Sequence, residues 1–520
     1  MRRRWMFGFA AGVGLAVLVS LLVWFLVPPR REAPRTASRD VAAPAEASTL
    51  DFISCWFALP EGRHARCGVL TVPENWGAPH SRSLHLRLVI FQGAAGGAAD
   101  PVIYLPGGPG EPAGIDREGV ARWWSLIDRT EWLQRRDLVV FDPRGAGLSE
   151  PSMNCPEIAD TAYRVFAEPL APAAADEQWA DAARRCYRRL AQSGIDLASY
   201  TTRSNVEDLH SLVSRLNYRS WNILAASYGT RVALRSLDRG HDGTRAVILD
   251  SVYPPAVAAY VEDGLAASDA FAALFRECDQ DRACHSAYPD IAQTFEKLVR
   301  RAAEAPIIID IPDPRGGPAL RARLDDGKLV DVLLYAFYDW RHIGQLPSII
   351  AALAKGEPQA LTELARDALD NYVSPRLSHG LYLSIECHDE FPFNRRDEVE
   401  HAAQSLPLFR RFALTALPLA ACPAWPVGEA GVTDRHPVAS EVPVLLLSGE
   451  LDPVTPPRWA KRAASHLRRG FPIEFRGAGH GVLAAHDCAS LLAGAFLAEP
   501  TRAPYADCLL AVGPPQFRVR

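Results

Sequence analysis

One serine of the chain, Ser227, has the sequence surroundings of a catalytic nucleophile. Ser227 lies at the centre of Ala225-Ala226-Ser227-Tyr228-Gly229. The apolar stretch Trp221–Ala225 precedes it, and a helical pattern, Thr230–Leu237, follows it. A sharp turn between a strand and a helix exposes a serine hydroxyl, and small neighbouring residues let the backbones come close. The pattern predicts a nucleophilic serine, although Ala225 stands where glycine is usual.

A serine hydroxyl needs a base near neutral pH, and the base needs an orienting acid. Two downstream loops supply candidates in the order acid, then base, that strand–turn–helix serine nucleophiles use. Asp452 follows the apolar stretch Pro443–Ser448, and His480 follows Pro472–Phe475. We therefore predict that Ser227 is the nucleophile, His480 the base and Asp452 the orienting acid.

Two neighbouring residues are alternatives for these roles. His486 is the alternative base, but we expect it to lie within the helix that follows the His480 loop. Glu450 is the alternative acid, but it precedes the turn that carries Asp452. Both are therefore placed second to His480 and Asp452.

The oxyanion that forms during acyl transfer needs backbone N–H donors. Gly107-Gly108-Pro109-Gly110 follows the apolar stretch Val102–Leu105, where one donor is expected. Pro109 has no N–H, so Gly108 is the better donor, and Tyr228, directly after the nucleophile, is the other. This chemistry needs no cofactor, and no Cys/His cluster has the spacing of a zinc site, so we predict neither a cofactor nor a metal.

The elements that position these residues alternate between strands and helices from residue 84 onward. This alternation favours an α/β fold with a mostly parallel sheet and helices on both faces. A capping box, Ser204-Asn205-Val206-Glu207, predicts the start of one helix. The predicted strands are Leu86–Phe91, Val102–Leu105, Leu138–Asp142, Trp221–Ala225, Ala246–Asp250, Pro443–Ser448 and Pro472–Phe475.

The strand rhythm stops after Tyr253-Pro254-Pro255 and returns near residue 443. We therefore predict a core in residues 51–255 and 441–520, interrupted by a helical cap in residues 256–440. Residues 1–50 are expected to form an N-terminal signal anchor and a linker.

The N-terminus suggests the compartment. Arg2, Arg3 and Arg4 precede an uncharged stretch of 23 residues, Trp5–Val27. As a helix this stretch would measure roughly 35 Å, enough to cross a bilayer. We favour an uncleaved signal anchor, followed by a flexible tether, over a cleaved signal peptide. The catalytic body would then lie outside the cytoplasm on a single-pass membrane anchor, or be secreted or periplasmic if the signal is cleaved.

Ten cysteines follow this segment. An even number behind an export signal is typical of a disulfide framework, and buried free thiols are the alternative. Sequence alone does not fix the connectivity. We predict that neighbours pair in order along the chain: Cys55–Cys67, Cys155–Cys186, Cys278–Cys284, Cys387–Cys422 and Cys488–Cys508.

Composition excludes two broad classes of function. The net charge is −5, so no basic surplus is present for binding nucleic acid. Only one apolar run is long enough to cross a bilayer, which excludes a multi-spanning membrane protein. The sequence contains nothing that fixes an oligomeric state.

The motifs together resemble the α/β hydrolases of the prolyl iminopeptidase and tripeptidyl aminopeptidase group, over about residues 50–510. The region through Cys488 and Cys508 resembles the tripeptidyl aminopeptidase branch. Pro106 stands where prolyl iminopeptidases carry His, which argues against strict prolyl iminopeptidase activity. The motifs that carry the resemblance are Gly107–Gly110, Asp142–Ser149, Ser227–Thr230, Gly449–Pro456 and Gly477–Gly481.

The resemblance implies an α/β-hydrolase fold with a helical cap and an exported serine hydrolase with Ser227, Asp452 and His480 as its triad. The Asp142–Ser149 motif is expected to shape a loop beside the site. An aminopeptidase must also bind a free N-terminal ammonium group, for which a buried carboxylate is suited. The resemblance points to a cap glutamate, and Glu386 is the candidate, with Asp389 and Glu390 next.

Two kinds of substrate remain open. Short peptides with a free N-terminus are the first, and the esters of a carboxylesterase or lipid-ester hydrolase with the same triad are the alternative. A non-catalytic binding module is a third reading, which the presence of all three triad residues disfavours.

Overall fold

The computed structural model describes residues 48–94, 100–168, 170–238, 243–505 and 507–519. The predicted signal anchor and nearly all of the linker lie outside these residues. None of the described helices combines the length and apolar character needed to cross a membrane. The described residues belong to one structural unit, residues 43–520.

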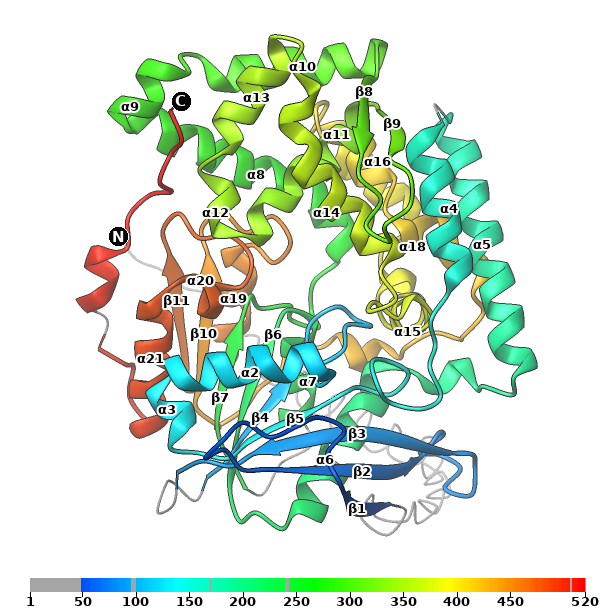
Figure 1. The fold of residues 1–520 in the computed structure, drawn as a ribbon, viewed down its shortest axis with the longest axis vertical. Helices are drawn as coiled ribbons and strands as arrows, with labels where there is room; N and C mark the ends of the chain where they lie inside the picture. The colour runs from blue at the N-terminus through cyan, green and yellow to red at the C-terminus, as the bar shows by residue number, and fades with distance from the viewer. Residues whose placement is uncertain (1–47, 95–99, 169, 239–242, 506, 520) are drawn as a thin grey trace, which may run out of the picture. The chain divides into compact units, whose positions relative to one another are not determined.

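A central sheet of nine strands is the frame of the core (Figure 1). Its order is β1-β2-β3-β5-β4-β6-β7-β10-β11. The first three strands are antiparallel and the other six run parallel to one another, as predicted for a mostly parallel sheet. The strands are β1 (Thr49–Ile53), β2 (Ala65–Pro73), β3 (Ser83–Phe91), β4 (Val102–Leu105), β5 (Leu138–Phe141), β6 (Trp221–Ala226), β7 (Thr244–Asp250), β10 (Val444–Gly449) and β11 (Gly470–Phe475).

All seven predicted strands are present, and β1 and β2 are additional. β1 escaped prediction because most of its residues are exposed and show no apolar alternation. From β4 the chain moves outward to β5 and then returns to β6 on the other side of β4. Such a reversal leaves a crevice at the carboxyl ends of the strands, which is where ligands bind in open α/β sheets.

Helices cover both faces of the sheet because alternate strand residues point to opposite sides. Leu445 and Leu447 face one cluster of buried residues, and Val444 and Leu446 face the other. The first face is covered by α2 (Arg117–Arg129), α3 (Glu131–Gln134), α20 (Val482–Ala485) and α21 (Asp487–Ala498). The second is covered by α6 (Thr202–Leu216), α7 (Tyr228–Leu237) and α19 (Pro457–Ala464).

Helix α6 begins earlier than the sequence predicted. The hydroxyl of Thr201 accepts a hydrogen bond from the backbone N–H of Ser204 at 3.2 Å, which makes Thr201 the N-cap. The predicted capping box at Ser204–Glu207 is therefore wrong, because the threonine one turn earlier already satisfies that N–H group.

Between β7 and β10 the chain forms the cap, mostly of helices. They are α8 (Ala259–Gln280), α9 (Arg282–Ala287), α10 (Ile291–Glu304), α11 (Asp326–Leu334), α12 (Trp340–Ile343), α13 (Leu346–Ala354), α14 (Thr362–Val373), α15 (His379–Ile385), α16 (Arg396–Gln404), α17 (Arg410–Leu414) and α18 (Leu417–Ala421). A two-stranded hairpin of β8 (Ile307–Ile311) and β9 (Leu320–Leu324) interrupts them and was not predicted. The predicted limits at residues 255 and 440 fall in the connections to β7 and β10.

Two helices from the first core segment also pack against the cap. α4 (Pro156–Ala167) contacts α14 and β9, and α5 (Pro172–Gln192) contacts α18 (Figure 1). The layer above the strand ends is therefore built from two separate stretches of sequence.

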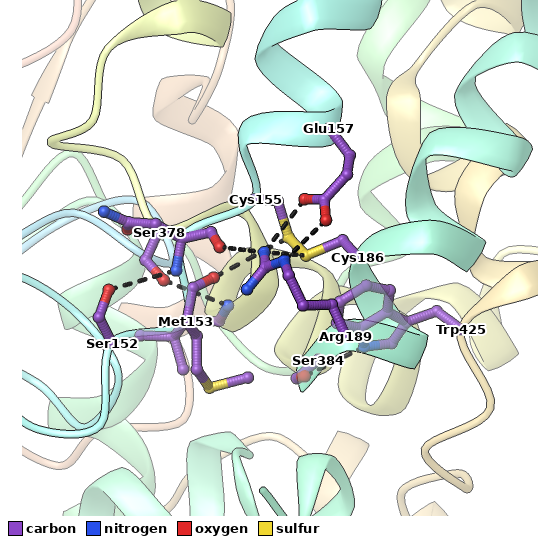
Figure 2. The surroundings of a disulfide bond; sticks show 11 residues. Ser152, Met153, Cys155, Glu157, Cys186, Arg189, Ser378, Ser384 and Trp425 are labelled. Carbon is purple, nitrogen blue, oxygen red and sulfur yellow. Dashed lines mark hydrogen bonds and ion pairs between the residues drawn. A yellow bond between two sulfur atoms is a disulfide. The ribbon is translucent and has the colours of Figure 1, made fainter. Parts of the chain in front are cut away.

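The five predicted disulfides are all present: Cys55–Cys67, Cys155–Cys186, Cys278–Cys284, Cys387–Cys422 and Cys488–Cys508. No described cysteine is free. The Cys155–Cys186 bond joins the start of α4 to α5, where Arg189 also binds the carboxylate of Glu157 at 2.7 and 3.0 Å (Figure 2). Cys155, Glu157 and Cys186 lie close enough to suggest a metal site, but both sulfurs are used in the disulfide.

Candidate active site

Ser227 occupies a strained turn between β6 and α7. Its φ of 52° and ψ of −122° lie outside the regions that non-glycine residues normally adopt, and such strain is concentrated at functional turns. A Cβ on Gly229 would lie 2.3 Å from the carbonyl oxygen of Leu105 and 2.6 Å from that of Pro106. Only glycine fits there, so the turn lies directly against the end of β4.

Asp452 and His480 form a hydrogen-bonded pair at the ends of β10 and β11. The Nδ1 atom of His480 lies 2.9 Å from Oδ2 of Asp452, which is fully buried. The Thr455 hydroxyl donates to the same oxygen at 2.6 Å, and the N–H groups of Val454 and Thr455 donate to the other oxygen at 2.9 and 2.8 Å. Burial alone would raise the pKa of Asp452, but His480 and these donors hold it below its ordinary value. The pairing at Nδ1 leaves Nε2 of His480 free to act as a base.

Asp250, at the end of β7, connects the serine turn to the histidine loop. Its backbone carbonyl accepts the N–H of Ser227 at 2.9 Å. Its carboxylate accepts the N–H groups of Val482 and Leu483, both at 2.9 Å. The neighbouring Ser251 hydroxyl accepts the N–H of Gly481 at 2.8 Å. Sequence reasoning missed Asp250; its only sequence signal is an acidic residue directly after a buried apolar strand.

The surroundings of His480 favour its protonated form. Burial acts to lower the pKa of His480, but the charges of Asp452, Asp250 and Glu111 outweigh it, and the pKa is raised. The ring of Tyr338 contacts His480 edge-on, with centroids 5.1 Å apart. Tyr338 is 51% exposed, whereas the His480 side chain is only 10% exposed.

The serine turn and the glycine loop present two free backbone donors. Gly108 has a φ of 99°, which glycine adopts easily, and a Cβ on Gly107 would lie 3.2 Å from Cβ of Ser227. No hydrogen bond within the described part of the chain uses the N–H of Gly108 or of Tyr228. The two residues predicted as oxyanion donors therefore lie on adjoining loops with their N–H groups available.

The motif Asp142–Ser149 holds the loop that follows these glycines, as predicted. The carboxylate of Asp142 accepts the N–H groups of Ala113 and Leu148, both at 2.7 Å. Arg144 is buried and forms a two-pronged ion pair with Asp208, at 2.7 and 2.6 Å. These contacts fix the loop without placing any of the motif's charges at Ser227.

The two alternatives for the triad, His486 and Glu450, have other partners. His486 lies between α20 and α21 rather than within a helix, which corrects the prediction. Its ring stacks on Phe475. Glu450 accepts the N–H of Gly477 at 3.0 Å. Among the described contacts, neither residue hydrogen-bonds to Ser227, Asp452 or His480.

The three cap acids considered from the sequence differ in their partners. Glu390 is buried and pairs with Arg231 at 2.6 Å and Arg435 at 2.8 Å. Asp389 pairs with His388 at 2.6 Å and also accepts the N–H of Thr202. Both are therefore neutralised within the fold.

Glu386 is the exception among these acids. It is buried, and its only hydrogen-bond donor in the described structure is the hydroxyl of Tyr260. Burial, followed by the charge of Glu390, raises the pKa of Glu386 to about 7. A buried carboxyl group of this kind would gain a cationic partner at low cost, because it is already removed from water.

Two further cap acids are partly removed from water. Burial raises the pKa of Asp263 to about 8, with Glu386 adding to the effect, and burial raises that of Asp331 to about 7. Neither forms an ion pair among the described residues. The charges of Asp263 and Asp331 both act on Tyr338, which contacts His480. The cap therefore contains acidic groups without ion-pair partners among the described residues, and two of them act on the tyrosine that contacts His480.

Comparison with known families agrees with this geometry. The family model of the alpha/beta hydrolase fold matches residues 100–277, which contain Ser227 and the glycine loop. The chain has the α/β-hydrolase fold. A second family model, described as TAP-like protein, matches residues 407–508 of this hydrolase, which contain Asp452 and His480.

Curated relatives of this α/β hydrolase carry two kinds of name. "Serine protease Hip1" of Mycobacterium tuberculosis is 27% identical over 482 residues, which cover 86% of this chain and 87% of the relative. "Carboxylesterase B" of the same organism is 27% identical over 470 residues, which cover 86% of each chain. Among solved structures, proline iminopeptidase of Mycobacterium smegmatis is 17% identical with a TM-score of 0.36, covering 80% of this chain and 96% of that one.

Proposed function

We propose that this α/β hydrolase is an exported serine hydrolase that cleaves short peptides from a free N-terminus. Ser227 attacks the scissile carbonyl while Nε2 of His480 accepts its proton, and Asp452 stabilises the resulting imidazolium. The N–H groups of Gly108 and Tyr228 bind the oxyanion. His480 then protonates the leaving amine, and water releases the acyl group from Ser227 by the same steps.

The observation that carries the peptide assignment is the unneutralised carboxyl group of Glu386. A free N-terminal ammonium group would supply the positive charge that Arg231 and Arg435 supply to Glu390. A charge-assisted hydrogen bond of this kind is strong when it is shielded from water. A neutral ester has no group that would use this site. The name of the relative, serine protease Hip1, agrees with this assignment.

Glu386→Gln is expected to lower kcat/KM for free-amine tripeptidyl anilides by ~10- to 150-fold, the loss of one charge-assisted hydrogen bond. Short neutral acyl esters make no such contact, so their hydrolysis should hardly change. N-acetylation of the peptide should reproduce the loss in the wild type and add little in the variant, because both changes remove one interaction. Glu429→Gln, at an exposed cap glutamate, is the matched control.

Equal cleavage of acetylated and free peptides by the wild type would rule out amine recognition. A preference for acyl esters over every free-amine peptide would instead favour a carboxylesterase, as the name of the second relative suggests. If acetylation lowers kcat/KM while Glu386→Gln leaves it unchanged, an acid other than Glu386 binds the ammonium group.

The five disulfides support a location outside the cytoplasm, where such bonds persist. The apolar stretch Trp5–Val27 would provide the export signal and the membrane anchor. Protein isolated under alkylating conditions should show no modified cysteine, and reduction before alkylation should expose all ten. Peptide mapping by mass spectrometry would measure this, and ten modified thiols in the unreduced protein would refute the proposed compartment.

A further inference from the structure

Glu111 places a carboxylate beside the nucleophile. It directly follows the glycine loop, Gly107–Gly110. The position that a Cβ on Gly107 would occupy lies 3.0 Å from Oε2 of Glu111 and 3.2 Å from Cβ of Ser227. The carboxylate and the serine side chain therefore lie on the same side of Gly107, beside the loop that carries the proposed oxyanion donor Gly108.

Unlike Asp452 and Asp250, Glu111 has no partner among the described residues. Asp452 and Asp250 each accept several hydrogen bonds. Within the described residues, Glu111 forms neither a hydrogen bond nor an ion pair, and solvent reaches its side chain. No contact of the fold therefore requires a carboxylate at this position.

The charge of Glu111 acts on the reacting groups. It contributes to the raised pKa of His480, and it also acts on Tyr104 and Tyr338. The surrounding protein partly removes the Glu111 carboxyl group from water, which raises its pKa, and the charge of His480 acts to lower that pKa. During acyl transfer a second negative charge develops at the oxyanion, and like charges a few ångströms apart repel. An unpaired carboxylate here opposes catalysis unless the substrate brings a positive charge.

We propose that Glu111 determines substrate specificity by binding a cationic group, an ammonium or a guanidinium, that the substrate carries within one residue of the scissile carbonyl. The proposal rests on the proposed role of Ser227 as nucleophile, and it holds whether the bond cleaved is an amide or an ester. Two groups carry this chemistry: the α-ammonium group of a substrate cleaved after its first residue, and the side chain of lysine or arginine next to the cleaved bond.

Matched substrates separate the effect of charge from that of size. Tripeptidyl anilides and the corresponding thioesters with lysine or norleucine before the cleaved bond differ in one ammonium group. Alanyl anilide and its N-acetyl form test the α-ammonium in the same way. In the wild type the cationic member of at least one pair should have the higher kcat/KM.

In Glu111→Gln that preference is expected to fall by about 10-fold. At the same time kcat/KM for the uncharged member should rise, because the charge that opposes the oxyanion is gone. Glu111→Asp should keep part of the preference. Glu131→Gln removes an exposed glutamate on α3 and should change neither rate, which controls for net charge.

A preference that is the same in Glu111→Gln and the wild type, for every pair, would overturn the proposal. So would an equal fall in both members of each pair, which would indicate a structural role. The thioesters keep this test independent of peptidase activity. If only esters are cleaved, the aminopeptidase proposal fails while the role of Glu111 is still measured.

Discussion

Ser227→Ala is expected to lower kcat/KM by ~10⁴–10⁶, leaving only the contribution of substrate binding and the oxyanion donors. The fold should be unchanged, because the Ser227 hydroxyl forms no hydrogen bond among the described residues and alanine keeps the same Cβ. Steady-state kinetics with peptide and ester substrates would measure the loss, and circular dichroism would verify the fold.

A fluorophosphonate probe provides a direct check on this residue. It should label the wild type at Ser227 and leave the variant unlabelled. Ser465→Ala, at an exposed helix end, is the matched control and should keep both labelling and turnover. Labelling of a different serine, or turnover in Ser227→Ala close to the wild type, would contradict the assignment.

Asp452→Asn is expected to lower kcat by ~10⁴, the order found when the orienting acid of such a triad is neutralised. Asparagine would lose the charge that stabilises the imidazolium of His480. The three groups that donate to Asp452, the Thr455 hydroxyl and two N–H groups, are also arranged for a carboxylate. A loss of less than 10-fold would argue that another acid orients the base.

The dependence of kcat/KM on pH tests the pairing of His480 with Asp452, because the direction of the expected shift is known. Below the pKa of His480 the imidazole is protonated and cannot accept the proton of Ser227, so kcat/KM falls as pH falls through that pKa. Because Asp452 raises the pKa of His480, the acid limb should lie above the ordinary histidine value of about 6.5. In Asp452→Asn the limb should move to lower pH. His486→Gln should leave it in place, since His486 is not bonded to the triad.

The three predicted triad residues could be placed from the sequence because each follows an apolar strand. Ser227, Asp452 and His480 lie at the ends of β6, β10 and β11, and parallel strands bring those ends to one edge. Asp250 also ends an apolar strand, but this signal alone does not indicate its role. Its role depends on a carbonyl and a carboxylate that bind two loops more than 200 residues apart in the chain.

The sequence does not show which of the cap acids is neutralised by a partner. Glu386 and Glu390 lie four residues apart in one short segment and have the same chemistry. Arg231, on α7 of the core, and Arg435, beyond α18, pair with Glu390 alone, and this separates a structural acid from a candidate binding group. Tertiary packing decides such pairings, and no local pattern of residues reveals them. The same holds for Glu111, whose position beside Ser227 depends on the path of the glycine loop.

The construction of the cap from two stretches of sequence limits how new specificities can be made by recombination. The described disulfides close loops within each stretch and none joins α4 or α5 to residues 256–440. Non-covalent contacts therefore unite them: apolar packing, and polar contacts such as those of Lys328 with the carbonyl of Val165 and of Arg396 with Asp176. The apolar faces of α4 and α5 fit this particular set of partners. A graft of residues 256–440 from another hydrolase would leave those faces mismatched. To exchange substrate preference between relatives, the segment from about residue 153 to 192 should therefore be transferred together with residues 256–440.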